Sequence, residues 1–262
     1  MTFPWRAVFI LCCGLSLLSA VGESADDAPS PLSDAGRSAL HKQLDEAILR
    51  LTPRIKQMPD DVSLYSKRGD LHFFRAQFPA AIDDYQKMLE LKPELEKSHW
   101  RLGLAYYYAG QYPAAARQFE LFRSIDDVDR ENGIWHFLSL VKEQGVTKAR
   151  SRILPYTKGD REPFPDLYRM FAGKLSSDDV LARIAKAELD SSERNKRLFY
   201  AQLYIGLNLI VEEHPEEARE FLKRAVNNPW PQRSGGGPHY MWQLARVQYE
   251  LLQDQRARSK GK

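Results

Sequence analysis

Cysteine is almost absent from this 262-residue chain, and the two present, Cys12 and Cys13, are adjacent and near the N-terminus. If this end is removed, no thiol remains, which excludes a disulfide framework, a thiol nucleophile and a thiolate metal site. A lipoprotein signal would place a small residue directly before the acylated cysteine, whereas Cys12 follows Phe9-Ile10-Leu11. We therefore predict that the chain is not lipidated.

The N-terminal segment has the pattern of a secretory signal peptide. Arg6 is followed by an uncharged apolar stretch from Ala7 to Ala20, with the small residues of Ala20-Val21-Gly22 just beyond it. We predict a signal peptide over residues 1–22, cleaved after Gly22 or, as second choice, after Ala25, which would make the chain periplasmic or secreted. The alternative is an uncleaved N-terminal membrane anchor, although the apolar stretch is shorter than the roughly 20 residues that a spanning helix needs.

Charge of one sign is also lacking, because 38 Lys and Arg stand against 35 Asp and Glu. A near-balanced charge argues against a nucleic-acid partner, which would require clustered excess basic charge. The content of 28% charged and 11% aromatic residues fits a folded domain. We expect a flexible spacer over residues 23–34, rich in Ser, Asp, Ala and Pro, and a solvated, disordered basic tail over residues 256–262.

The familiar catalytic and metal-binding motifs are missing. None of the six histidines has the two-histidine spacing of a zinc helix, and the sequence contains neither a nucleophile elbow nor a phosphate-binding loop. The glycines at 235–237 lack the lysine that a phosphate loop requires, so we interpret them as a flexible connector. We predict a non-enzymatic protein with no cofactor, no metal site and no small-molecule substrate.

What the chain does contain is a repeat with a step of 34 residues. Gly69 and Gly103 are one step apart, and other columns keep the same step with aromatic residues and proline. The most regular column is alanine, at Ala47, Ala81, Ala115 and Ala149. A 34-residue step with glycine, aromatic, small and proline landmarks in this order is the tetratricopeptide (TPR) signature. It predicts an all-α superhelix of stacked helical hairpins, an α-solenoid, over residues 35–255.

The register of the columns predicts the boundaries of the elements. Prolines such as Pro79 and Pro113 stand two residues before the alanine column and mark the start of each second helix. We expect a first helix over 36–57, hairpins over 62–95 and 96–129, a degenerate hairpin over 130–163, a degenerate short pair over 164–190, a hairpin over 199–232 and a capping helix over 239–253.

The repeats also resemble a particular family, the NlpI-type periplasmic TPR lipoproteins. The resemblance covers about residues 35–255 and rests on Ser98-His99-Trp100-Arg101-Leu102-Gly103-Leu104-Ala105-Tyr106-Tyr107, Trp135, Ala149, Phe171-Ala172-Gly173, Leu203-Tyr204-Ile205-Gly206 and Leu222-Lys223-Arg224-Ala225-Val226-Asn227-Asn228. It implies an adaptor of the cell envelope, often dimeric, that brings peptidoglycan hydrolases together with a protease that degrades them. The chain departs from the family in lacking the lipobox cysteine, and the family offers no catalytic residues to carry over.

In such a superhelix the first helices of successive hairpins line a concave groove. Counting from the glycine columns, the first repeat presents Ser63, Ser66, Asp70, Phe73 and Phe74 to the groove. The second repeat and its neighbours present Lys97, Trp100, Arg101, Leu104, Tyr107, Tyr108 and Trp135. Trp, Tyr and Arg dominate binding hot spots, so we predict that this surface binds a protein or peptide. The alternative is that part of the aromatic cluster packs against neighbouring hairpins as core.

Ser66 and Asp70 stand where TPR proteins that grip a C-terminal carboxylate have lysine and asparagine, which argues against that mode of binding. A protein-binding adaptor is therefore the leading interpretation. A self-associating structural module, such as a homodimer, is the main alternative, and an envelope enzyme is a weaker one.

Overall fold

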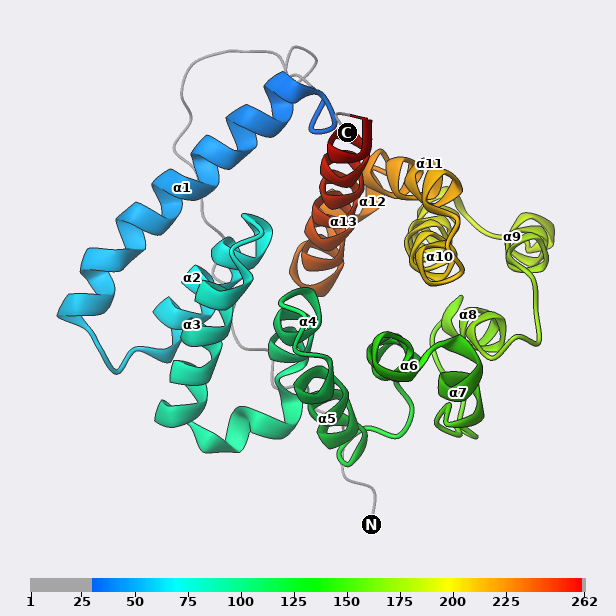
Figure 1. Ribbon diagram of the computed structural model, residues 1–262, viewed down its shortest axis with the longest axis horizontal. Coiled ribbons are helices and arrows are strands. Elements are labelled where there is room, and N and C mark those ends of the chain that lie inside the picture. The colour runs from blue at the N-terminus through cyan, green and yellow to red at the C-terminus, as the bar shows by residue number, and fades with distance from the viewer. Residues whose placement is uncertain (1–29, 261–262) are drawn as a thin grey trace.

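The computed structural model describes residues 30–260, and within them the chain is all-α (Figure 1). The predicted signal peptide lies outside the described residues. No described helix is long and apolar enough to cross a membrane. In chain order the α-helices are α1 (Asp34–Gln57), α2 (Val62–Phe74), α3 (Phe78–Leu91), α4 (Trp100–Tyr108), α5 (Tyr112–Arg123), α6 (Arg130–Gln144), α7 (Val146–Ser151), α8 (Phe164–Phe171), α9 (Ser177–Lys186), α10 (Ser191–Val211), α11 (Pro215–Val226), α12 (Trp230–Ser234) and α13 (Gly236–Lys260). A 3-10 helix, η1 (Pro93–Ser98), precedes α4.

The repeat columns explain how the two helices of each hairpin meet. A Cβ placed on Gly69 would lie 2.6 Å from the ring of Tyr85, and one on Gly103 would lie 2.8 Å from the ring of Phe119. The glycines therefore let the aromatic side chain of the second helix rest directly on the backbone of the first. The alanines of the same register, Ala81 and Ala115, are fully buried. Close approach of backbones at these columns is what the 34-residue step predicted.

Caps and prolines set the ends of the helices. Asp61, Asp129, Ser176 and Asp190 each accept a backbone N–H of the first turn that follows, in the manner of an N-cap. Five of the described α-helices, α3, α5, α8, α11 and α12, carry proline within the first two positions, where the missing N–H costs no hydrogen bond.

Several predicted boundaries were wrong. The first helix of the repeat at 199–232 begins eight residues earlier, because the Asp190 side chain caps it by accepting from the amide of Glu193. The first helix expected from residue 96 begins at Trp100, because η1 occupies the residues before it. The capping helix expected over 239–253 runs over Gly236–Lys260. Two of the three glycines of the expected connector and most of the basic tail are therefore helical.

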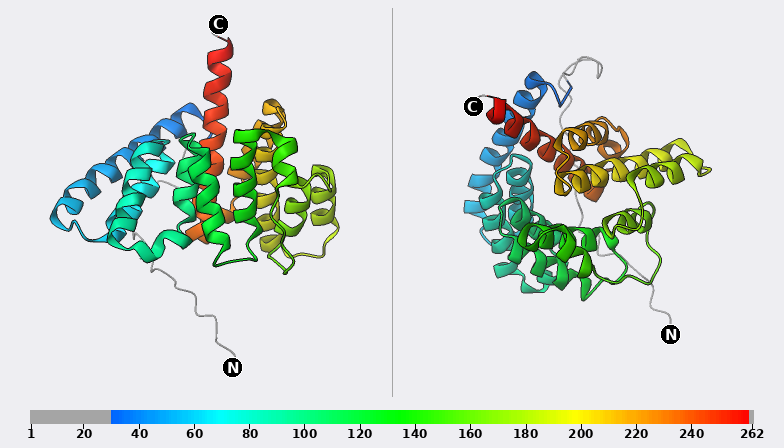
Figure 2. Two further views of the ribbon diagram at one scale, coloured as in Figure 1. Left: turned by 60° about the horizontal axis from the view of Figure 1, so that its bottom comes forward. Right: turned by 45° about the vertical axis from the view of Figure 1, so that its right-hand side comes forward.

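The hairpins form an arc, and α13 lies inside it (Figures 1 and 2). This helix packs against α11 and α12 and reaches across the interior to α2. Its first part places the ring of Tyr240 within 5.2 Å of Phe73, 5.0 Å of Phe74 and 5.0 Å of Trp100, measured between ring centroids. The C-terminal helix thus occupies the concave side of the first two repeats.

A fully buried arginine holds α13 in this position. Arg246 donates to the carbonyl oxygen of Phe74 on α2, to Glu250 at 2.6 Å and to Gln243 at 3.0 Å. Glu250 in turn lies 3.1 Å from the ring nitrogen of His41 on α1. The contacts join the last helix of the chain to the first two.

Replacing Arg246 with methionine should lower the free energy of unfolding by about 3 kcal/mol, because it leaves the Phe74 carbonyl and Glu250 without their buried cation. Urea denaturation followed by circular dichroism measures this change. The matched control is Arg256→Met on the same helix, where the partly exposed side chain lies 3.6 Å from Glu216 and should contribute well under about 1 kcal/mol. Equal losses in the two variants would show that α13 is not held by Arg246.

Candidate functional site

The structure places the nine predicted groove residues in four different settings. Four of them are buried and belong to the core: Phe74, Leu104, Tyr107 and Trp135. For these four residues the alternative interpretation, packing as core, describes the structure, because α13 and neighbouring helices cover them; of the four, Trp135 also borders a cavity. Tyr108 is partly buried, and its ring stacks on that of Phe78 with 5.3 Å between the ring centroids.

Asp70 and Arg101 pair with each other. The guanidinium of Arg101 lies 2.7 Å from the carboxylate of Asp70, which also accepts from the hydroxyl of Tyr85 at 2.7 Å. This pair stabilises the contact between the first two repeats and the Tyr240 cluster. Lys97 is exposed, but it lies in η1 and not on a first helix, because the helix begins only at Trp100.

Trp100 is half-buried and lies at the edge of an interior cavity. The cavity has a volume of about 440 Å³ and is bounded by α4–α6 on one side and by α10, α12 and α13 on the other. This size is within the range of small-ligand pockets, which is about 300 to 1,000 Å³. Its wall is formed by Trp100, Phe119, Phe122, Asp129, Glu131, Asn132, Trp135, Arg161, Lys196, Tyr200, Trp230, Gly237, Pro238 and Met241. We call this space the interior cavity.

The polar part of the wall comes from the start of α6. Asp129 caps the helix by accepting the backbone N–H of Glu131 at 3.0 Å and of Asn132 at 3.4 Å. Since residues four apart share a helix face, Glu131 and Trp135 are carried on the same side. The N-cap and the first two turns of α6 therefore place two carboxylates and an indole in the cavity wall.

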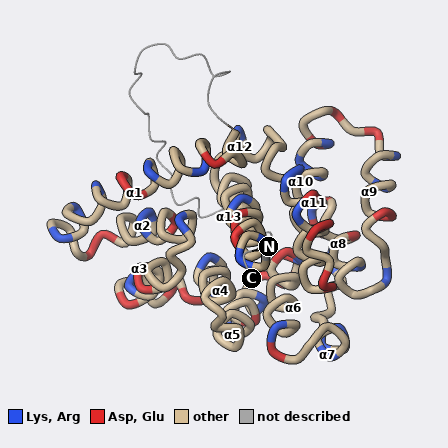
Figure 3. Tube along the Cα trace, turned by 45° about the horizontal axis from the view of Figure 1, so that its top comes forward, with Lys and Arg blue, Asp and Glu red and all other residues tan. Residues whose placement is uncertain are grey.

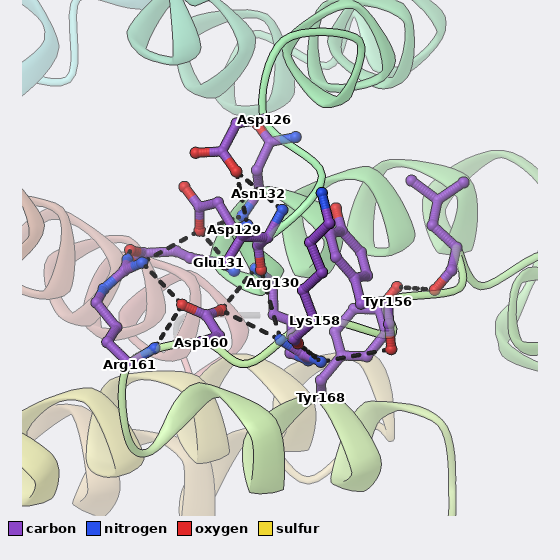
Figure 4. Close-up of polar contacts among 12 residues, drawn as sticks. Asp126, Asp129, Arg130, Glu131, Asn132, Tyr156, Lys158, Asp160, Arg161 and Tyr168 are labelled. Carbon is purple, nitrogen blue, oxygen red and sulfur yellow. Dashed lines mark hydrogen bonds and ion pairs between the residues drawn. The ribbon is translucent and has the colours of Figure 1, made fainter. Parts of the chain in front are cut away.

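Arg161 reaches the same place from the irregular segment at 152–163 (Figure 4). Its guanidinium pairs with Glu131, lies 3.3 Å from Asp129 and 3.5 Å from Asp160, and stacks over the ring of Phe164. The segment itself is fixed by Arg130, which donates to the carbonyl oxygen of Lys158 at 2.7 Å. A cation from a loop thus meets two anions from a helix start.

Glu131 also ends a short chain of hydrogen bonds inside the protein. The indole N–H of Trp135 donates to the hydroxyl of Tyr204 at 2.9 Å, and that hydroxyl donates to Glu131 at 2.5 Å. Burial raises the pKa of Glu131 to about 7, although Arg161 and Tyr204 oppose the shift. Burial likewise raises the pKa of Asp129, against the attraction of Arg161. Both carboxylates are held in places where their negative charge is costly.

The comparisons with known proteins bear on these hairpins. No family model matches the chain. A curated protein from Haemophilus influenzae, described as a lipoprotein NlpI homolog, is 23% identical over 180 residues, which is 68% of this chain and 57% of that protein. The chain resembles the NlpI-type tetratricopeptide-repeat proteins.

A solved tetratricopeptide repeat protein from Parabacteroides merdae shares 14% identity with a TM-score of 0.44, over 85% of this chain and 86% of its own. The NlpI-type likeness covers less than two thirds of the curated relative's length. Solenoids of such repeats present extended concave surfaces that bind other proteins.

Some other titratable groups have a structural role. His99, for example, accepts the backbone N–H of Leu102 as the cap of α4, and burial lowers its pKa to about 3. Among residues 30–260, no three or more His, Cys, Asp or Glu side chains are grouped so that they could hold a metal ion.

Sequence reasoning identified Trp100 and Trp135 but missed the rest of the cavity wall. Glu131 and Arg161 were not singled out, because the groove positions were counted from a glycine column that the third repeat does not keep. The one available signal was the long stretch after α7 without repeat landmarks, where Arg161 lies. Irregular segments on a rigid scaffold often carry functional side chains.

Glu131 gives the stability of the protein a particular dependence on pH. Its folded pKa of about 7 exceeds its ordinary value of 4.5, so the folded state binds the proton more tightly. The carboxylate therefore destabilises the fold above about pH 7, and this cost is relieved as the pH falls through 7 toward 4.5.

At about pH 8 we expect the wild type to have a lower free energy of unfolding than the Glu131→Gln variant. Between about pH 8 and about pH 5 this difference should decrease by about 1 to 3 kcal/mol. Urea denaturation of both proteins at several pH values measures this difference. Both proteins contain the same buried histidines, whose effect on stability has the opposite pH dependence. Taking the difference between the two proteins removes that effect. Parallel pH profiles for the two proteins would contradict the assignment.

Proposed function

We propose that this protein is a non-enzymatic scaffold of the cell envelope that binds a segment of a partner protein in the interior cavity. The observation that carries the proposal is the cavity itself, an opening on the concave side that α13 does not fill. Its wall contains Trp100, Trp230 and Tyr200, residue types that contribute most to binding hot spots. A volume of about 440 Å³ suits a few side chains of an extended segment and not a folded domain.

The envelope location rests on the predicted signal peptide over residues 1–22. The resemblance to the NlpI type suggests peptidoglycan hydrolases and a protease as the partners to look for. Under this proposal the protein brings such partners together and does not itself turn over a substrate.

Trp100→Ala should weaken capture of the partner by about 2 kcal/mol, a roughly thirtyfold loss, because it removes a large aromatic side chain from the cavity wall. The measurement is affinity purification of the tagged mature chain from its own envelope fraction, with quantitative mass spectrometry of what is retained. Ile125→Ala is the matched control, since its side chain is exposed outside the cavity.

Urea denaturation of the same proteins separates binding from folding, because Trp100 also packs against Tyr240. Trp230→Ala is a second variant on the opposite wall. A partner that is retained equally by the wild type and both tryptophan variants would place its binding site elsewhere.

One observation favours the second candidate, self-association. Leu49 on α1 is 71% exposed and borders a surface hollow of about 650 Å³ lined mainly by charged residues of α1. Single exposed apolar residues are common on protein surfaces, so the second candidate rests on Leu49 lying beside a hollow that a second copy of the chain would cover.

Leu49→Lys should shift a dimer toward the monomer in sedimentation, because it places a charge in an apolar contact. The matched control is Arg50→Ala, a change at the neighbouring exposed position of the same helix. A wild-type chain that sediments as a monomer at micromolar concentration would remove self-association through α1.

A further inference from the structure

The charged side chains that border the interior cavity differ in how deeply they are buried. The carboxylates lie deeper, with the side chain of Glu131 14% exposed and that of Asp129 22% exposed. The cations lie nearer to solvent, with Arg161 40% exposed and Lys196 30% exposed. Over the rest of the chain, residues of both signs are interspersed (Figure 3). The cavity therefore has an acidic interior behind a mixed rim.

The cations of the wall are already engaged. Arg161 contacts three carboxylates, those of Asp129, Glu131 and Asp160. The ammonium of Lys196 lies 3.1 Å from Glu193. A ligand that brings a further anion would have to compete with these partners.

The carboxylate of Asp129, by contrast, can accept further hydrogen bonds. All hydrogen bonds to the Asp129 carboxylate within the described residues go to Oδ1, and none goes to Oδ2. A carboxylate offers about four lone-pair sites on its two oxygens. The raised pKa values of Asp129 and Glu131 agree with this, because burial is not fully compensated by the cations nearby.

Asn132 is a second and independent sign of a missing donor. It belongs to the cavity wall and is only 4% exposed. Its amide N–H donates to the carbonyl oxygen of Phe119 at 2.7 Å, but its Oδ1 has no partner among the described residues. A buried acceptor left unpaired costs about 1 to 3 kcal/mol, which a bound donor would recover.

Aromatic rings form the rest of the wall. Trp100, Trp135, Tyr200 and Trp230 border the same cavity. The face of an aromatic ring attracts a cation, and such cages with a nearby carboxylate recognise ammonium and guanidinium groups. The wall therefore combines aromatic side chains with the carboxylates of Asp129 and Glu131, and the unpaired amide oxygen of Asn132 belongs to a residue of the same wall.

We propose that the interior cavity receives a basic side chain, lysine or arginine, of the bound partner segment, with its charged end against Asp129 and Glu131 and its aliphatic stem between the aromatic rings. The inference rests on the proposed function, since it names the chemistry by which the partner is held. It assigns specificity to the first turn of α6.

Blocked tripeptides Ac-Ala-Xaa-Ala-amide test the assignment, with lysine, arginine, norleucine or glutamate at the centre. Tryptophan fluorescence and calorimetry with the full mature chain measure their binding. We expect lysine or arginine peptides to bind at least about tenfold more tightly than the norleucine and glutamate peptides. Binding should weaken with added salt and from about pH 8 to about pH 5, as Glu131 takes up a proton.

Two variants make the test specific. Glu131→Gln keeps the shape of the side chain and should weaken the basic peptides about tenfold at about pH 8. Lys97→Met, a change at an exposed lysine outside the cavity wall, should leave binding unchanged. Equal binding of the norleucine peptide, preference for the glutamate peptide, or no effect of Glu131→Gln would overturn the inference.

The outcomes also distinguish this inference from the proposed function. Loss of the envelope partner in Trp100→Ala without any preference for basic peptides would leave the scaffold in place and reject the basic side chain. Binding of basic peptides in a protein whose Trp100→Ala variant retains its envelope partner would reject the cavity as the partner's site, and the inference with it.

Discussion

The position of α13 inside the arc is the constraint on which the rest of the structure depends. Arg246, fully buried, ties this helix to the backbone of α2 through the carbonyl of Phe74, and Tyr240 fills the space among Phe73, Phe74 and Trp100. The arc is thereby closed on its own C-terminal helix. The concave surface that a repeat protein of this type normally offers is reduced to the interior cavity beyond Tyr240.

The repeat hairpins were predictable because each is fixed by contacts between neighbours in sequence. Gly69 and Tyr85 are 16 residues apart, as are Gly103 and Phe119, and the second pair lies one step of 34 after the first. The docking of α13 has no such period. Arg246 and Phe74 are separated by 172 residues, and nothing in either local sequence identifies the other as its partner. This is why a groove predicted from the repeat register turned out to be largely core.

The cavity wall shows the same division between local and distant contacts. Trp100 and Trp135 lie on first helices at register positions, so the sequence indicated them. Arg161 lies on a segment of irregular backbone, and its place is fixed by Arg130 and by Gly133, whose missing side chain leaves room for the ring of Tyr156. A Cβ on Gly133 would lie 2.7 Å from that ring. Such a fit can be read only from the folded chain.

The acidic start of α6 is where the structure departs most from what local rules favour. A carboxylate at a helix N-terminus is normally stabilised by the backbone N–H groups and the helix dipole, which lowers its pKa. Asp129 accepts two such N–H groups and still has a raised pKa, because burial outweighs them. The two buried carboxylates are not fully compensated by nearby cations, and an unpaired amide oxygen lies beside them. Neither feature stabilises the fold. Under our proposal the group that would restore the balance is a cation that donates hydrogen bonds, supplied by the bound partner segment.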